Sequence, residues 1–161
     1  MKWEFTGEIK TIGTITLRRV RYPETGEVGG WVENERNLSQ IGNARVSGDA
    51  RVSGDAQVSG DAQVYGDARV SGNARVSDNA QVYGNAQVYG NASIERLGDY
   101  LHIDGLAFPV TVWRGHARIG CELRPIREWL AVTRHPELSE SRIAEMRRLL
   151  MLVFKEFGGV E

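Results

Sequence analysis

The segment that decides the fold is residues 44–91, which read ARVSGD ARVSGD AQVSGD AQVYGD ARVSGN ARVSDN AQVYGN AQVYGN. The same six-residue pattern extends over the whole tract 41–94. Each repeat has an aliphatic residue, an alanine two positions before it, and a turn of Gly followed by Asp or Asn; Asp78 stands once in the glycine position. A fixed short period indicates one structural unit that is stacked on itself.

A period of six favours neither a helix nor a long flat strand. An amphipathic helix needs apolar residues every three or four positions, and regular glycines interrupt a long strand. The period instead predicts short extended segments joined by corners, where Gly and Asp or Asn supply the unusual backbone angles. Three such sides close a triangular coil, and the next coil stacks on it at roughly 4.8 Å. The tract 41–94 therefore predicts a prism of about three coils with valine and alanine inside.

The repeat resembles that of hexapeptide-repeat proteins, which form a left-handed β-helix. Their motif is an aliphatic residue followed four positions later by a small one, and every pair from Val46 and Ala50 to Val88 and Ala92 matches it. The resemblance implies a mainly β fold, built on a short left-handed parallel β-helix.

The flanking residues are similar to those of uncharacterised phage and prophage members of this superfamily. The segments that carry this similarity are 29–33 (GGWVE), 37–39 (NLS) and 120–121 (GC), the last of which precedes a short helix that carries Ile126 and Trp129. The similarity implies an origin in a phage or prophage.

The chain is expected to have three parts. Residues 1–40 predict an N-terminal β cap, because Trp3 and Phe5 alternate with polar residues and because the open end of a β-helix needs cover. Residues 41–94 form the β-helix, and residues 95–161 predict a C-terminal segment of strands and helices. The elements expected in that segment are strands at 100–103, 108–113 and 117–121, a short helix from Pro125, and a helix from about 139 to 157.

Composition and charge narrow the class of partner. The formal net charge is −1 over 161 residues, which gives no bias toward nucleic acid or membrane. Cys121 is the only cysteine, so no intramolecular disulfide is expected. The first residues lack the apolar core of a signal peptide, and no apolar run is long enough to span a bilayer. We therefore expect a cytoplasmic protein that binds neither membrane nor a DNA or RNA duplex.

The outward-facing columns of the prism can be read from the sequence, because residues eighteen apart lie above one another. One column contains Arg51 and Arg69, whose charges repel unless an anion lies between them. A phosphate suits this place, because Arg binds phosphate through two parallel hydrogen bonds, and nearby Tyr and Gln side chains could contact a base. The candidate ligand-binding residues are Arg51, Arg69, Arg45, Arg75, Tyr65, Tyr83, Tyr89 and Gln87.

Plainer interpretations of the same residues stay open. The arginines could be solvated, or could pair with Asp49, Asp67 or a neighbouring chain. Tyr65 and Tyr83 could be contacts between subunits.

A homotrimer is expected, because a prism of three small coils buries little apolar surface and because hexapeptide-repeat proteins commonly form trimers. The alternative is a monomer that its two caps complete. The C-terminal helix carries a broad apolar stripe, which suggests contact with another chain or with its own prism. The residues of that stripe are Ile143, Met146, Leu150, Val153, Phe154 and Phe157, with Leu149, Met151 and Leu152 beside them.

The expected function is binding without catalysis. The best-known hexapeptide-repeat proteins are acyltransferases with a histidine base, and the tract 41–94 contains no histidine. The sequence contains no cluster of histidines that would indicate a metal site, and we expect no cofactor. We expect a phage-type trimer that sequesters a small phosphorylated ligand, such as a cyclic nucleotide immune signal, in clefts between subunits. The alternatives are a module that binds a host protein, and an acyltransferase whose base is His102, His116 or His135.

Overall fold

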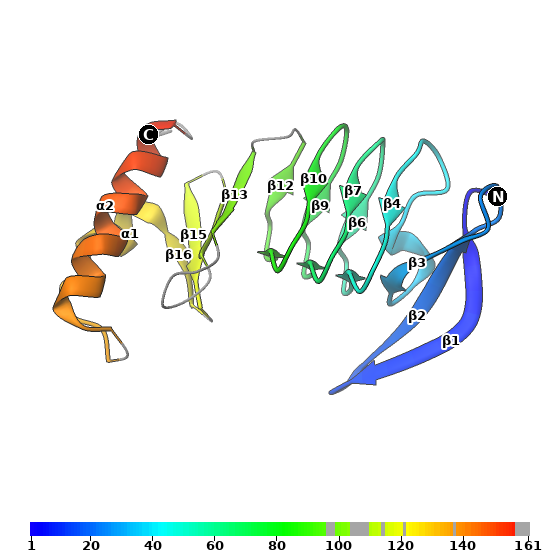
Figure 1. Cartoon of the computed structure of the whole chain (residues 1–161), viewed down its shortest axis with the longest axis horizontal. Coiled ribbons are helices and arrows are strands. Elements are labelled where there is room, and N and C mark those ends of the chain that lie inside the picture. The colour runs from blue at the N-terminus through cyan, green and yellow to red at the C-terminus, as the bar shows by residue number, and fades with distance from the viewer. Residues whose placement is uncertain (96–98, 104–109, 114, 121, 137, 157–161) are drawn as a thin grey trace. The chain divides into compact units, whose positions relative to one another are not determined.

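The computed structural model describes residues 1–95, 99–103, 110–113, 115–120, 122–136 and 138–156 (Figure 1). The chain divides into two compact units, Met1–Gly98 and Asp99–Glu161. The predicted fold class is confirmed: the chain is mainly β, with a β-solenoid in the first unit and two helices at its C-terminal end.

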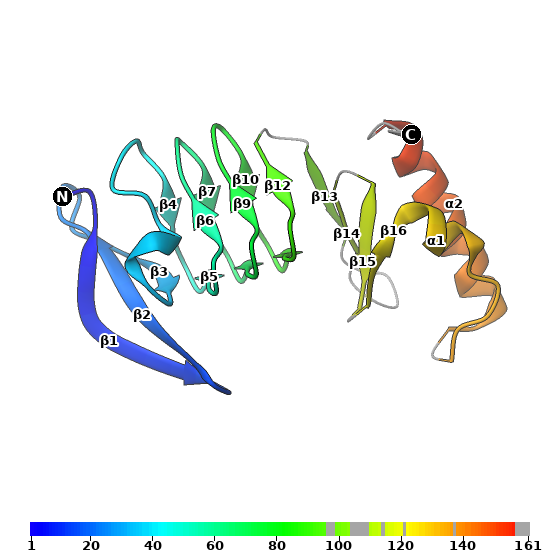
Figure 2. The same ribbon diagram turned by 180° about the vertical axis from the view of Figure 1, so that it is seen from behind.

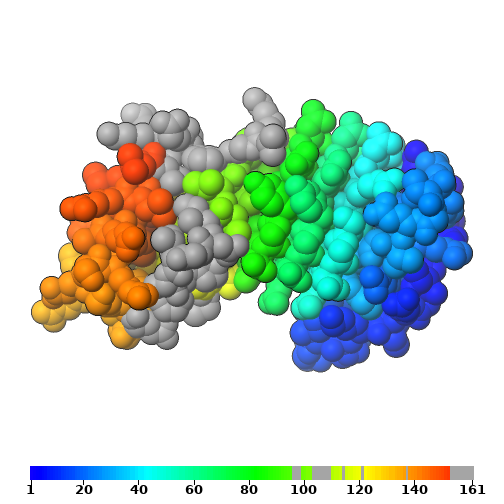
Figure 3. Space-filling view, in the orientation of Figure 1, coloured from blue at the N-terminus to red at the C-terminus, as the bar shows by residue number. Residues whose placement is uncertain are grey.

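The repeat tract folds into two-residue strands that stack in three columns, and the coils form parallel ridges in the space-filling view (Figure 3). Strands of successive coils pair in parallel with residues eighteen apart opposite each other, as in Arg51 with Arg69 and Arg69 with Gln87. These pairs confirm the columns read from the sequence. The strands are β4 (Arg45–Val46), β5 (Arg51–Val52), β6 (Gln57–Val58), β7 (Gln63–Val64), β8 (Arg69–Val70), β9 (Arg75–Val76), β10 (Gln81–Val82), β11 (Gln87–Val88) and β12 (Ser93–Ile94).

The solenoid interior is made of the repeated valines and alanines, all of them buried. The turn glycines have positive φ angles, and Asp78 adopts the same conformation with φ of 52°. Asp tolerates this left-handed region better than most residues, because its short polar side chain can hydrogen-bond locally. Backbone carbonyls of each coil accept hydrogen bonds from N–H groups of the preceding coil, as in Arg51 N–H to Ala68 O at 2.9 Å.

The N-terminal segment is a three-stranded antiparallel sheet that continues into the solenoid. Its strands are β1 (Glu4–Ile12), β2 (Ile15–Tyr22) and β3 (Glu27–Val32), followed by the short helix η1 (Glu35–Asn37). Strand β3 pairs in parallel with β5, beside which it lies in Figure 2, and Leu38 bridges in parallel to Val58. Residues 27–40 therefore add a coil, and the solenoid has about four turns where the sequence predicts about three.

This first coil is two residues longer than the others, because Val32 pairs with Val52 and Leu38 with Val58. The two additional residues lie between Leu38 and Val46, which are eight apart, whereas their partners Val58 and Val64 are six apart. On the preceding side of this coil, where η1 stands in place of a strand, the buried side chain of Asn37 replaces a backbone donor. Its Nδ2 donates to Ala56 O at 2.8 Å, where the other coils use a backbone N–H, and to Gly54 O at 3.0 Å.

Two aromatic side chains attach the N-terminal segment to the solenoid. The indole of Trp3 is buried and donates to Leu38 O at 3.1 Å. The hydroxyl of Tyr22 donates to Val46 O at 3.0 Å and accepts from Val46 N–H at 2.7 Å.

The C-terminal unit is an antiparallel sheet with helices α1 (Ile126–Ala131) and α2 (Glu140–Glu156). Its strands are β13 (Tyr100–Ile103), β14 (Val110–Trp113), β15 (His116–Ile119) and β16 (Glu122–Pro125). The sequence does not predict strand β16, because Pro125 indicates the start of a helix. Of the predicted residues, Phe108, Cys121 and Phe157 lie outside the described residues.

The core of this unit lies between sheet and helices. Its buried members include Val112, Trp129, Met146 and Leu150. Helix α2 buries the predicted positions Ile143, Met146 and Leu150, while Met151 and Leu152 are exposed. No helix in the described part of the chain is long and apolar enough to cross a membrane.

Candidate functional site

A row of basic residues crosses the outer face of the six-stranded sheet β1-β2-β3-β5-β8-β11. Arg19 lies opposite Trp31, Trp31 opposite Arg51, and Arg51 opposite Arg69. Because Val32 and Val52 point into the solenoid, the neighbouring Trp31 and Arg51 face outward. We call Lys10, Arg19, Trp31, Arg51 and Arg69 the basic ladder.

Two cations of the basic ladder lie over the same aromatic ring. The Nζ of Lys10 is 5.5 Å from the centroid of Trp31, and the Cζ of Arg19 is 5.1 Å from it. Cation–π attraction favours each contact. Arg19 is also tied down by Gly29 O, which accepts from its Nε at 3.3 Å, and by Glu8 at 3.4 Å.

Arg51 and Arg69 are adjacent and have no ion pair with any carboxylate that the structure describes, Asp49 and Asp67 included. Their Cα positions are one strand spacing apart, roughly 4.8 Å. Two guanidinium groups so placed raise the electrostatic energy of the face unless an anion lies between them. The arrangement is therefore suited to an anion.

Two hydrogen-bond donors within the basic ladder are buried and lack an acceptor among the described residues. They are the indole Nε1 of Trp31 and the Nε of Arg51. A buried donor without an acceptor costs about 1–3 kcal/mol. The two residues are direct neighbours in the β3–β5 pair, so the middle of the ladder has an excess of donors.

The other predicted ligand residues lie on other columns or at the end of this one. Gln87 follows Arg69 in the same row, and Tyr89 comes directly after the strand β11 that carries Gln87. Arg75 is exposed on a different sheet, between Gln57 and Ser93. The structure brings together Arg51, Arg69 and Gln87, and places Arg75 away from them.

The third sheet, β10-β7-β4, carries Arg45 and two tyrosines. Arg45 pairs with Glu27 at 2.5 Å and lies over the ring of Tyr22 at 4.7 Å. The rings of Tyr65 and Tyr83 stack with centroids 5.4 Å apart and planes 16° apart. The guanidinium of Arg45 thus has a carboxylate partner, unlike Arg51 and Arg69.

Sequence reasoning missed Lys10, Arg19 and Trp31. The sequence contains one signal for Trp31. Val32 and Leu38 are six residues apart, as the repeated valines are, and Ser39 follows Leu38 as a serine follows several of those valines. Trp31 therefore occupies the outward position that Arg or Gln has in the later repeats. The contacts of Lys10 and Arg19 depend on the register of an irregular hairpin. That register shifts between Phe5 and Ile9 and between Arg19 and Arg21.

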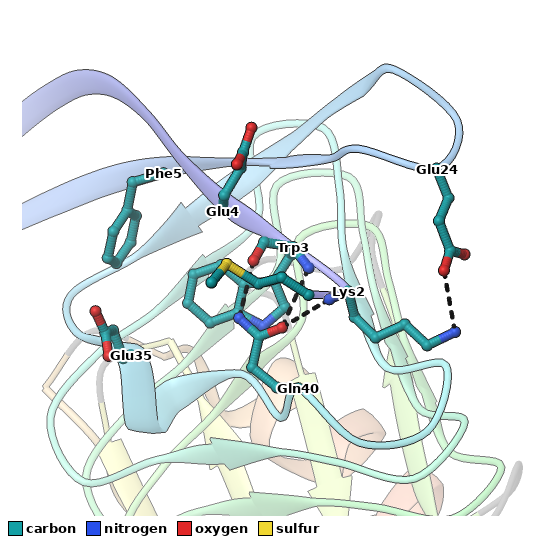
Figure 4. A pocket seen from close by; sticks show the side chains of 8 residues that line it. Lys2, Trp3, Glu4, Phe5, Glu24, Glu35 and Gln40 are labelled. Carbon is teal, nitrogen blue, oxygen red and sulfur yellow. Dashed lines mark hydrogen bonds and ion pairs between the residues drawn. The ribbon is translucent and has the colours of Figure 1, made fainter.

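A pocket of about 690 Å³ lies at the N-terminal end of the first unit (Figure 4). Its polar groups serve the fold: Gln40 holds the backbone of Lys2 and Trp3, and Lys2 pairs with Glu24 at 3.6 Å. Its charged side chains are Lys2, Glu4, Glu24 and Glu35. The excess of carboxylates disfavours an anionic ligand in this pocket.

The histidines of the C-terminal unit have separate surroundings. His102 bonds to Thr111 at 2.8 Å, His116 is exposed, and His135 is 3.2 Å from Glu122. Hydrogen bonds from Arg124 and then from His135 lower the pKa of the Glu122 carboxyl. Within the described ranges, no group of three or more His, Cys, Asp and Glu side chains could hold a metal ion.

Comparison with known proteins bears on the repeats alone. Residues 44–60, 62–78, 68–84 and 80–96 each match the family model described as the YdcK beta solenoid repeat. Neither the curated proteins nor the solved structures provide a match. The stacked coils and the matched repeats lead to the same conclusion: the chain is a β-solenoid repeat protein.

Proposed function

We propose that the protein binds a small phosphorylated ligand, without catalysis, on the outer face of its six-stranded sheet. The observation that carries the proposal is the pairing of Arg51 with Arg69 in adjacent coils, with no carboxylate of the described chain to neutralise either. Arg binds phosphate oxygens through two parallel hydrogen bonds, so two stacked Arg side chains suit one phosphoryl group.

The surroundings of Arg51 and Arg69 support an anion over a solvated face. Lys10 and Arg19 add positive charge at Trp31, and Glu8 is the carboxylate that pairs with Arg19. Gln87 continues the row beyond Arg69, where its amide can hydrogen-bond the rest of the ligand.

The finer parts of the proposal come from the sequence. The resemblance to phage and prophage hexapeptide-repeat proteins makes a nucleotide signal of the bacterial host, such as a cyclic nucleotide, the ligand that we propose. A homotrimer would place faces of neighbouring chains side by side. The basic ladder lies within one chain and does not depend on the trimer.

Equilibrium binding tests the proposal with a panel of cyclic and linear mono- and dinucleotides. We expect at least one probe to bind the wild type saturably, and the variant that combines Arg51→Ala with Arg69→Ala to bind it at least tenfold more weakly. The matched control is Arg75→Ala, which removes an exposed arginine from the same repeat position on another sheet and should leave the affinity unchanged. Thermal unfolding checks that all variants fold.

Two results would contradict the proposal. One is that no phosphorylated probe binds the wild type. The other is that the Arg75→Ala control loses as much affinity as the double variant, because the effect would then reflect overall charge.

A further inference from the structure

We propose that the basic ladder selects ligands with two or more linked phosphoryl groups, and that Lys10 and Arg19 bind the groups beyond the first. The inference rests on the proposed function and assigns a narrower ligand class to the same face, in which a linear nucleotide with linked phosphoryl groups takes the place of a cyclic nucleotide. An inorganic oligophosphate and a nucleoside di- or triphosphate share this chemistry.

The cations of the ladder form two pairs at different places. Lys10 and Arg19 both lie over the ring of Trp31, on strand β3. Arg51 and Arg69 are on β5 and β8, one and two strand spacings further along the sheet. Strands are spaced roughly 4.8 Å apart, so a phosphoryl group held midway between Arg51 and Arg69 is about 7 Å from Trp31 along the sheet. A chain of phosphoryl groups can contact both pairs at once.

The charges of the ladder also exceed those of one phosphoryl group. Lys10, Arg19, Arg51 and Arg69 are cationic, and Glu8 is the carboxylate that pairs with Arg19. A phosphate monoester carries about −1.5 to −2 charges near neutral pH. One such group leaves positive charge uncompensated, whereas a diphosphate or triphosphate matches it.

Unsatisfied donors lie between the two cation pairs. The buried Nε1 of Trp31 and the buried Nε of Arg51 have no acceptor in the part of the chain that the structure describes, and the two residues are register partners. Lys10 and Arg19 both lie over the ring of Trp31, and Gly29 O and Glu8 hold Arg19 in place. Movement of the Lys10 side chain onto a bridging phosphoryl group brings its oxygens within reach of these donors, so the middle of the ladder is also complementary to a phosphate chain.

Calorimetric titration with inorganic phosphate, pyrophosphate and tripolyphosphate tests this selectivity on the full chain. We expect the affinity of the wild type to rise at least tenfold from phosphate to tripolyphosphate. Lys10→Gln, which replaces the ammonium by a neutral amide on a shorter stem, should reduce that ratio at least threefold, and Lys10→Arg should restore it. The matched control Lys2→Gln removes a lysine that pairs with Glu24 elsewhere in the unit, and should keep the wild-type ratio.

A parallel titration with adenosine triphosphate and with adenosine separates the two sources of this chemistry. Equal affinity for tripolyphosphate and adenosine triphosphate identifies the phosphate chain as the recognised part, and a higher affinity for the nucleotide adds a contact to the base; both agree with the inference. Equal affinity for phosphate and tripolyphosphate overturns the inference while the proposed function survives. A chain-length effect that Lys10→Gln does not alter also overturns the role of Lys10.

Discussion

The repeat coils and the N-terminal coil solve the same packing problem in different ways. In the repeat tract every coil uses valine, alanine and a tight turn, and the backbone bonds to the next coil directly. The N-terminal coil and the sheet before it use single side chains in unique roles, namely Asn37 in the coil and Trp3 and Tyr22 in the segment that precedes it. The basic ladder crosses the boundary between the two regions. The comparison indicates that the repeats form the regular solenoid, whereas the irregular N-terminal segment supplies residues that make the outer face of the six-stranded sheet unlike the other two faces.

The largest expected effect is on the side chain that replaces backbone hydrogen bonds in the irregular coil. Asn37→Ala should lower the free energy of unfolding by about 3–5 kcal/mol, because it leaves Gly54 O and Ala56 O without their donor and removes the acceptor of Asn34 N–H. Denaturant unfolding measures the loss.

The matched control is Asn73→Ala in a repeat turn. The amide of Asn73 donates to Asn91 on the exposed surface at 3.2 Å, so this change should cost less than about 1 kcal/mol. Similar losses for the two variants would contradict the distinction between the regions.

A second contrast compares two glycines that are needed for different reasons. A Cβ at Gly30 would lie 2.7 Å from Ala50 O and 2.8 Å from Val46 Cγ1, where β3 approaches the next coil. Gly30→Ala should therefore destabilise by about 2–3 kcal/mol through overpacking.

At Gly84 a Cβ would meet no described heavy atom within 4 Å, and the cost comes from its φ of 63°. Gly84→Ala should lower the stability by about 1–2 kcal/mol. Thermal or chemical unfolding compares the two. A larger loss at Gly84 than at Gly30 would mean that the β3 contact is looser than its geometry indicates.

A third prediction concerns Tyr22, whose hydroxyl binds both backbone groups of Val46. Burial raises the pKa of Tyr22 from 10.0 to about 12. The folded chain keeps this proton at a pH where the unfolded chain has lost it. The stabilising contribution is therefore complete below pH 10 and is lost as the pH rises to about 12, by roughly 2–3 kcal/mol.

Tyr22→Phe should cost about 1–2 kcal/mol at neutral pH and should make the loss of stability between pH 10 and 12 smaller. Unfolding measured across this pH range checks both parts. A wild type and variant with parallel pH profiles would show that Tyr22 is not the group that titrates.

The predictability of the fold follows the same division. A period of six determines which residues stack, so the Arg51–Arg69 pair could be read from the sequence before the structure. The extra coil could not, because two additional residues between Leu38 and Val46 break the period and because the side chain of Asn37 replaces a backbone donor. For this reason the sequence predicts Arg51 and Arg69 of the basic ladder but not its other three residues. Its Trp31 belongs to the irregular coil, and the contacts of Lys10 and Arg19 depend on two register shifts in a hairpin.

The most direct test of the account observes the indole N–H of Trp31 by nuclear magnetic resonance during a titration with tripolyphosphate. The four tryptophans give four indole signals, and Trp31→Phe assigns the relevant one. We predict that this signal shifts saturably and that the indole of Trp129, which is bonded to Ala117 O, stays in place. A Trp31 signal that does not move at saturating tripolyphosphate would contradict the claim that the basic ladder is the binding face.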